Sequence, residues 1–227
     1  MSKEYIKYKN KYIEFKKMFS FNSYGGGGNI KIKQDIDKLY ETKNFVKLSG
    51  NTIDLFNKTK SANTYGELTQ EGMINLINEL IDKNIIKNIN DLVYYDLGSG
   101  YGKTVINAVV NINFKRAVGI ELAIERVKIA QNALNKLDDH FKKRIQLIHG
   151  NILEKDISDA DVIFISNLCF SKEINDKLAN KIVNECKKGV IIMSSKQLIH
   201  NRLRNVLNTT TKMTWSQNSS IHINIKI

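Results

Sequence analysis

The sequence predicts an α/β fold, in which a mostly parallel seven-stranded sheet ends in a C-terminal antiparallel hairpin and follows a small helical N-terminal region. Three observations support this prediction. Short apolar runs alternate with segments whose apolar residues recur every three or four positions, as in strands separated by helices. A chain of 227 residues can form one substantial core with an appendage. The last two apolar runs have no helix between them, so we expect them to pair antiparallel.

The N-terminal region is expected to contain three parts. Residues 1–24 carry aromatic residues at three- and four-residue steps among lysines, which predicts a basic amphipathic helix that docks on the protein itself or on a partner. The glycine run that follows predicts a linker over residues 25–29. Residues 30–62 are expected to form a helical cap of one or two short helices. The main domain then covers residues 63–227.

The main domain is expected to alternate strands with helices. A helix after Thr69 precedes the first strand at 92–96, and a helix over 103–112 follows it. One apolar helix face from Val127 to Phe141 separates the second and third strands. Ser171 can cap a later helix that Gly189 stops, with Cys186 in the core. The other strands are expected at 117–121, 145–149, 162–166, 190–194, 212–216 and 220–226.

Composition and charge narrow the classes of function. With 35 Lys and Arg against 23 Asp and Glu, the net charge of +12 favours an anionic partner such as nucleic acid or nucleosome, although a soluble basic enzyme has the same balance. No apolar run approaches the roughly 20 residues that span a bilayer, so we expect no membrane contact. Cys169 and Cys186 lack a nearby cysteine–histidine cluster, which suggests neither a zinc site nor a disulfide framework and fits an intracellular protein.

The most informative segment is residues 94–104, where an apolar strand ends on Asp96 and turns through three alternate glycines. Glycines permit positive φ and the close approach of a ligand to the backbone. A P-loop would need glycine at Leu97, and a dinucleotide fold would space its glycines one, three and six, so neither matches. Glu121 ends the next strand, where a carboxylate would reach ribose hydroxyls, as it also does in nicotinamide enzymes. The pattern resembles motif I of class I S-adenosylmethionine-dependent methyltransferases; a turn without a ligand is the other interpretation.

Further motifs resemble one methyltransferase family over about residues 60–200. Together they are similar to the disruptor-of-telomeric-silencing family, the non-SET histone-lysine methyltransferases. The resemblance implies a class I methyltransferase fold, S-adenosyl-L-methionine as cofactor, and a core-histone lysine in the nucleosome as substrate. The motifs are Thr64-Tyr65-Gly66-Glu67, Asp96 to Lys103, Gly119-Ile120-Glu121, Gly150-Asn151-Ile152-Leu153, Ile163 to Phe170 and Ser194-Ser195-Lys196.

The resemblance also implies a role for each matching residue, with Asn167, Phe170 and Tyr65 as the catalytic candidates and no metal. Asn167 and Phe170 would wall a lysine channel near the methyl group, with Ser194 and Ser195 at its edge. The residues expected to bind the cofactor are Tyr65, Gly66, Glu67 and Leu68 over its methionine end, Asp96, Gly98, Ser99, Gly100, Gly102 and Lys103 beneath it, Glu121 at the ribose, Asn151 and Ile152 at the adenine, and Asn167 near the methyl group.

Four departures from the family pattern affect this site. Leu68 stands for threonine, Lys103 for glutamine, Asn151-Ile152 for an acid–aromatic pair, and Ser166 for the first of two asparagines. The tyrosine that the family pattern places in the lysine channel, after Trp215, has no match in this chain. Ile221 and His222 lie nearest to that position, and His222 is a candidate site residue. Cofactor affinity and substrate choice are therefore expected to differ from the family pattern.

The attacking lysine must be a neutral amine, so an apolar channel shaped by Leu168, Phe170 and Trp215 is expected to disfavour its charged form. Two other functions stay open: a nucleic-acid methyltransferase and a non-catalytic cofactor-binding scaffold. Base-methylating enzymes usually carry two prolines after the fourth strand, whereas this chain has none. The basic clusters Lys142-Lys143-Arg144, Lys187-Lys188 and Lys196 through Arg204 are candidates for DNA contact. We expect a soluble intracellular protein in the nucleus or at host chromatin. The Tyr-Lys-rich opening resembles the starts of giant-DNA-virus proteins, and a viral protein would be located in a virus factory or virion.

Overall fold

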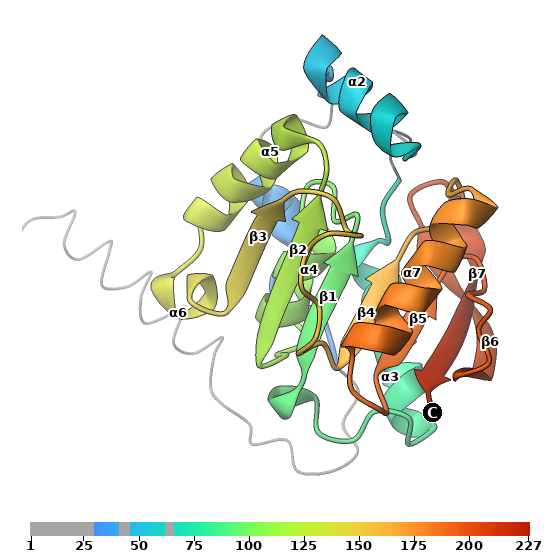
Figure 1. Ribbon diagram of the computed structural model, residues 1–227. Coiled ribbons are helices and arrows are strands. Elements are labelled where there is room, and N and C mark those ends of the chain that lie inside the picture. The colour runs from blue at the N-terminus through green and yellow to red at the C-terminus, as the bar shows by residue number, and fades with distance from the viewer. Residues whose placement is uncertain (1–29, 41–45, 62–65) are drawn as a thin grey trace, which may run out of the picture.

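The computed structural model describes residues 30–40, 46–61 and 66–227, where the chain forms a seven-stranded sheet of order β3-β2-β1-β4-β5-β7-β6 (Figure 1). β1 to β5 run parallel, and β7 pairs antiparallel with both β5 and β6. The predicted fold class is confirmed, whereas the expected helix over 1–24 and the linker over 25–29 lie outside the described residues. The strands are β1 (Val93–Leu97), β2 (Arg116–Glu121), β3 (Ile145–His149), β4 (Val162–Ile165), β5 (Ile191–Ser194), β6 (Leu203–Met213) and β7 (Ser216–Lys226).

The C-terminal hairpin is longer than expected, and its turn lies elsewhere. The prediction placed strands at 212–216 and 220–226, but the two strands meet at Thr214 and Trp215 instead. β6 is an edge strand, and helix α3 (Gln70–Asp82) packs against it. Most of its alternate side chains therefore face solvent, and its polar, threonine-rich sequence lacks the apolar run that marked the other strands.

The helix expected at Ser171 begins at that cap, and the helix expected after Thr69 begins there, but the helices differ from the prediction in extent. Ser49, Thr69 and Ser171 each accept a hydrogen bond from the first turn of their helix, as N-caps do. The single helix expected from Val127 to Phe141 is wrong, because the chain leaves helical geometry between α5 and α6. Gly189 lies in the turn after Glu185 and not at the helix end. The helices are α2 (Gly50–Thr59), α4 (Lys103–Val110), α5 (Ile124–Asn135), α6 (Asp139–Lys142) and α7 (Lys172–Glu185), with 3-10 turns η1 (Ile36–Leu39) and η2 (Ile89–Asp91).

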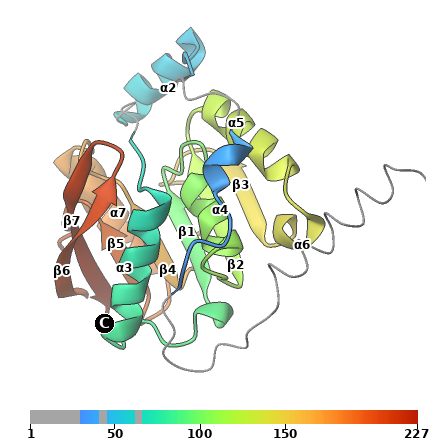
Figure 2. The ribbon, with the colours of Figure 1, turned by 180° about the vertical axis from the view of Figure 1, so that it is seen from behind.

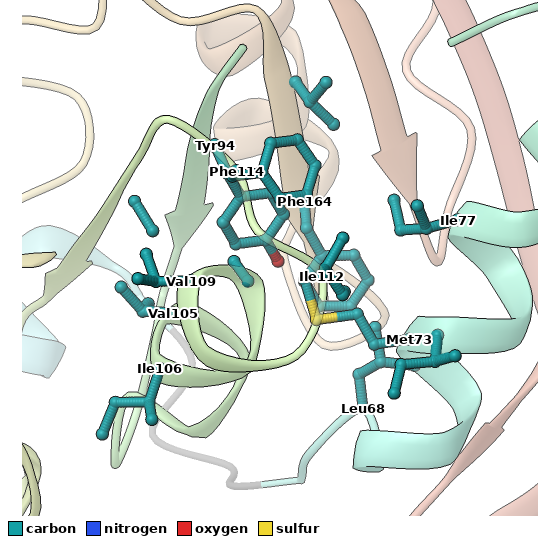
Figure 3. Packing of buried hydrophobic residues seen from close by; sticks show 14 of the residues in the cluster. Leu68, Met73, Ile77, Tyr94, Val105, Ile106, Val109, Ile112, Phe114 and Phe164 are labelled. Atoms are coloured by element: carbon teal, nitrogen blue, oxygen red, sulfur yellow. The ribbon is translucent and has the colours of Figure 1, made fainter. Parts of the chain in front are cut away.

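Apolar side chains on both faces of the sheet hold the domain together. Tyr94 faces the cluster formed with α3, α4 and α5, and its ring centroid lies 5.3 Å from that of Phe114 (Figure 3). Tyr95, the next residue of β1, faces a second cluster with α7, in which Cys186 is buried as expected. Because β1 is buried on both faces, its side chains are aliphatic or aromatic at every position except Asp96.

The two helical pieces before α3 do not form one cap. Ile36 and Leu39 of η1 belong to the main core cluster, next to α4. By contrast, α2 lies beyond the carboxyl ends of the parallel strands, as both views show (Figures 1 and 2). The cap region therefore contributes one piece to the core and one piece to the edge of the sheet where ligands bind in open α/β folds.

Candidate functional site

A cavity of about 340 Å³ opens at the carboxyl ends of β1, β2 and β4. Its volume lies within the range of small-molecule sites. The wall combines backbone of the glycine loop, one carboxylate, one guanidinium and several apolar side chains. The lining residues are Phe56, Ser61, Gly66, Leu97, Gly98, Glu121, Leu122, Arg126, Asn151, Ile152, Ser166, Leu168, Cys169, Phe170 and Trp215.

The glycine loop after β1 has the geometry that its sequence predicts. Gly98, Gly100 and Gly102 have φ of 95°, 55° and 73°, a region that disfavours other residues. The N–H groups of Gly98 and Ser99 donate to the Ile120 carbonyl and fasten the loop to β2. A Cβ on Gly98 would meet no atom within 4 Å, so this backbone is open to the cavity. A Cβ on Gly102 would lie 3.0 Å from the Ala130 side chain, so Gly102 is needed for packing against α5.

Glu121 is fixed at the cavity wall. Its side chain is buried, Oε2 accepts from the Gly100 N–H at 2.9 Å, and Oε1 accepts from the Ala123 N–H at 2.8 Å. Arg126 Nη1 lies 3.6 Å from Glu121 Oε1. The sequence interpretation found Glu121 but missed Arg126, since one arginine in an amphipathic helix carries no signal of its own.

Asp96 lies behind the loop, 3% exposed, and accepts a hydrogen bond from the Thr104 hydroxyl. Burial raises the pKa of Asp96 to about 7; the Thr104 hydrogen bond opposes this shift, and the nearby carboxylates of Glu121 and Glu67 add to it. Asp96 therefore exchanges its proton near neutral pH.

Lys103 and Leu68 lie at a second, smaller cavity of about 60 Å³ and not at the large one. Lys103 Nζ is 2.9 Å from Asp37 Oδ1 and 2.9 Å from Glu67 Oε2. Partial burial opposes the charge of Lys103, but the two carboxylates outweigh it and raise the pKa of the lysine. Leu68 is buried in the main core and pairs with Met213. As cofactor ligands, Leu68 and Lys103 stay predictions that this placement does not support.

Asn167 does not line the cavity, so its contact with substrate or cofactor stays a prediction that this placement does not support. It is fully buried; its Nδ2 donates to Asn175 Oδ1 at 2.7 Å and to the Lys196 carbonyl at 2.8 Å, and its Oδ1 accepts from the Lys196 N–H at 2.8 Å. The amide thus ties the end of β4 to the segment after β5. Ser166, one position earlier, lines the cavity instead.

An apolar rim borders the mouth of the cavity. Leu168 and Trp215 are each 47% exposed, and Phe170 lies beside them in the lining. The Trp215 ring packs on Gly66 so closely that a Cβ there would lie 2.1 Å from a ring carbon. Thr214 N–H also donates to the Glu67 carbonyl at 2.8 Å. The tip of the β6–β7 hairpin and residues 66–67 therefore build one side of the mouth together.

The other predicted residues are placed as follows. Asn151 and Ile152 line the cavity, but the Asn151 amide is engaged in its own turn with Glu154 and Leu153. His222 contacts Asn208 in the hairpin, at 2.8 Å, and is not part of the lining. Ser194 and Ser195 are buried and are not part of the lining either, and their hydroxyl groups lack a hydrogen-bond partner among the described residues. Tyr65 lies outside the described residues.

Comparison with known proteins identifies the family. The histone methylation protein DOT1 family matches residues 43–225. The chain belongs to this family. It is 35% identical over 104 residues to a protein-lysine N-methyltransferase of Saccharolobus islandicus, covering 46% of this chain and 62% of the relative. It is 30% identical over 156 residues to a histone-lysine N-methyltransferase, H3 lysine-79 specific, of Caenorhabditis elegans, covering 64% of this chain and 16% of the relative. The chain therefore spans less than two thirds of either relative.

A solved structure supports the fold assignment for this DOT1 protein. The glycopeptide N-methyltransferase MtfA superposes with a TM-score of 0.54 at 8% identity, covering 69% of this chain and 97% of that one. The DOT1 family and the methyltransferase fold make S-adenosylmethionine the cofactor. The large cavity fits it, because the open backbone at Gly98 and the fixed carboxylate of Glu121 face the same space. Within the described ranges, no group of three His, Cys, Asp or Glu side chains could hold a metal, and no helix could cross a membrane.

Proposed function

We propose that this DOT1 protein transfers a methyl group from S-adenosylmethionine to a lysine side chain of a core histone in the nucleosome. The observation that carries the proposal is a single cavity with two different ends. One end presents the glycine loop and Glu121, and the other ends in the apolar rim of Leu168, Phe170 and Trp215. The two relatives described above are named for lysine methylation, and the Caenorhabditis elegans protein is named for lysine 79 of histone H3.

The proposal gives each end its residues. Glu121 would accept the ribose hydroxyls, and Ile152 would face the adenine beside Asn151. Gly66 and Glu67 would lie at the methionine end, and Tyr65 keeps the same proposed place. Phe170 is the candidate catalytic residue, since it is an aromatic member of the apolar rim that lines the cavity. Asp96, Ser99, Gly100 and Gly102 would support the loop that carries Gly98.

When bound, the cofactor supplies a methyl group on a positively charged sulfur. The protein must then present the lysine as a neutral amine, which costs about 4.6 kcal/mol at pH 7 from a reference pKa near 10.4. The apolar rim lowers this cost because it excludes water and disfavours the ammonium form. Ser166 lines the cavity and would offer a hydroxyl to orient the amine. In-line transfer requires that the amine be held opposite the sulfur across the methyl group. The lysine proton leaves to solvent, so no dedicated general base is required.

The decisive experiment supplies methyl-labelled S-adenosylmethionine with nucleosomes, free histones, DNA or RNA in separate reactions. We expect label on a histone lysine, with nucleosomes the better substrate. The Glu121→Ala variant should lose the label because it loses the cofactor. The net charge of +12 is also compatible with a nucleic-acid methyltransferase. Label found only in DNA or RNA would establish that alternative, and no transfer despite bound cofactor would establish a scaffold.

We propose DNA contact through the exposed residues Lys196 and Arg202, in the segment that follows β5, and Arg204, at the start of β6. This segment begins where Asn167 holds the Lys196 backbone, near the end of β4. The other basic clusters are partly engaged within the protein, since Arg144 donates to the Phe114 carbonyl and Lys187 pairs with Asp161. Contact with nucleosomal DNA would place the protein at chromatin.

A further inference from the structure

Helix α2 contributes to the wall of the cofactor cavity, although it belongs to the N-terminal region and not to the sheet domain. Phe56 of α2 and Arg126 of α5 both line the cavity together with Glu121. Their side chains are buried, at 4% and 7% exposure. The Arg126 guanidinium carbon lies 5.8 Å from the centroid of the Phe56 ring. A continuous set of contacts therefore runs from α2 through Arg126 to the carboxylate at the ribose end.

Glu125, the neighbour of Arg126, docks α2 at its first turn. Its Oε1 accepts from the Ser49 N–H at 3.0 Å, and its Oε2 accepts from the Thr52 hydroxyl at 2.9 Å. Although burial opposes ionisation, the hydrogen bonds from Ser49 and Thr52 lower the pKa of Glu125 to about 2. The carboxylate is thus charged at neutral pH and lies at the positive end of the α2 dipole. Thr52 and Phe56 are one helical turn apart, so docking of Thr52 orients Phe56 toward the cavity.

The other end of α2 contacts the opposite side of the cavity. Nζ of Lys60, the residue that follows α2, lies 3.3 Å from Oε2 of Glu173 in the first turn of α7. α2 therefore spans from the helix after β2 to the helix after β4, over the carboxyl edge of the sheet (Figure 1). Because both side chains of this ion pair are exposed, we assign the main docking contribution to Glu125.

The adenine end of the cavity needs an aromatic side chain from elsewhere in the chain. Ile152 is aliphatic, and the Asn151 amide donates to Glu154 and accepts from the Leu153 N–H. The side chains of these two residues therefore supply neither an aromatic ring nor an unengaged acceptor. A purine stacks favourably on an aromatic face.

We infer that Phe56 stacks against the adenine of the cofactor, that Arg126 positions Glu121 for the ribose, and that Thr52 and Glu125 act as positioning residues for this wall. The inference rests on the cofactor site of the proposed function but not on the identity of the methyl acceptor. It makes cofactor affinity depend on α2, a helix that precedes the main domain expected over residues 63–227.

The first test measures binding of S-adenosylhomocysteine to the full chain by titration calorimetry. Phe56→Ala and Phe56→Leu should weaken binding about 5- to 100-fold, since both remove the ring and Leu keeps apolar packing. Phe56→Tyr should retain wild-type affinity. Ile53→Ala on the same helix, at a residue 40% exposed and absent from the lining, is the matched control and should change nothing. Wild-type affinity in both ring-less variants would overturn the inference.

The second test separates positioning from general stability. Thr52→Val removes the hydroxyl that donates to Glu125 at nearly constant size, whereas Thr52→Ser keeps it. We expect Thr52→Val to raise the KM for S-adenosylmethionine about 3- to 10-fold with little change in kcat, and Thr52→Ser to restore it. An unchanged KM would refute the role of this contact. A wild-type protein that binds S-adenosylhomocysteine but methylates no histone would refute the proposed function and leave this inference intact.

Discussion

The affinity for S-adenosylmethionine should depend on pH through Asp96. The pKa of this buried carboxyl is raised to about 7, mainly by burial and further by the carboxylates of Glu121 and Glu67. The cofactor brings an ammonium and a sulfonium to the site, and only the ionised carboxylate attracts them. Below pH 7 the Asp96 carboxyl must therefore lose its proton before the cofactor binds. The apparent Kd then rises about tenfold for each unit by which the pH is lowered.

The magnitude follows from the pKa. Between pH 7.5 and pH 5.5 the ionised fraction of a group with a pKa of about 7 falls about 25-fold, which corresponds to about 2 kcal/mol of binding free energy. The window ends at pH 7.5 because the α-amino group of the cofactor loses its own charge near pH 8. Calorimetry in two buffers with different ionisation enthalpies should also detect the release of about one proton per cofactor below pH 6.5.

The free protein offers an independent readout with a defined sign. Because the folded-state pKa of Asp96, about 7, exceeds its ordinary value of 3.8, the protonated carboxyl stabilises the fold. This contribution is complete below pH 3.8 and is lost as the pH rises through 7, by about 4 kcal/mol in total. Compared with Asp96→Asn, the wild type should therefore lose stability between pH 5 and pH 8. An affinity that is flat from pH 5.5 to 7.5, or that varies equally in Asp96→Asn, would refute the reasoning.

Three further predictions concern the frame of the site. Asn167→Ala should lower the free energy of unfolding by about 2 to 3 kcal/mol in urea titrations, because it leaves the Lys196 backbone groups without their partner. Ser166→Ala should slow methyl transfer and leave the free energy of unfolding unchanged. Gly66→Ala should push away the ring of Trp215, the single tryptophan, and shift its fluorescence; Gly50→Ala, where a Cβ meets nothing within 4 Å, should not. If about six cations contact phosphates, nucleosome affinity should fall about a thousandfold from 50 to 200 mM salt, and a flat response would exclude DNA contact.

The sequence predicted the parallel part of the sheet better than the hairpin for a physical reason. β1 and β4 are buried on both faces, so burial imposes aliphatic or aromatic side chains at successive positions, and Asp96 of β1 is the one exception. β6 is an edge strand with alternate side chains exposed, and its threonines and asparagines resemble a loop. Nothing local in the sequence marks the start of β6 at Leu203, because the length of β6 is determined by its pairing with β7.

The site divides in the same way. The glycine loop and Glu121 were predictable because a strand end and the turn after it are specified within a few residues. The contact of Trp215 with Gly66 and that of Phe56 with Arg126 join segments far apart in the chain, so only tertiary packing creates them. Asn167 shows a third case, in which the residue type matched the family pattern while the backbone directed its neighbour Ser166 to the cavity.

The charges around the site explain why a cationic cofactor suits it. Three carboxyl groups lie near the glycine loop, and two of them have cations of their own: Glu67 pairs with Lys103, and Glu121 lies beside Arg126. In the described part of the chain Asp96 has only the Thr104 hydroxyl as a close partner, which is why burial can raise its pKa to about 7. A bound cofactor would supply the missing cation, so the carboxyl would ionise and the attraction would strengthen in the buried site. Methyl transfer would then remove the sulfonium charge, which would weaken this attraction and favour exchange of the product for a new cofactor.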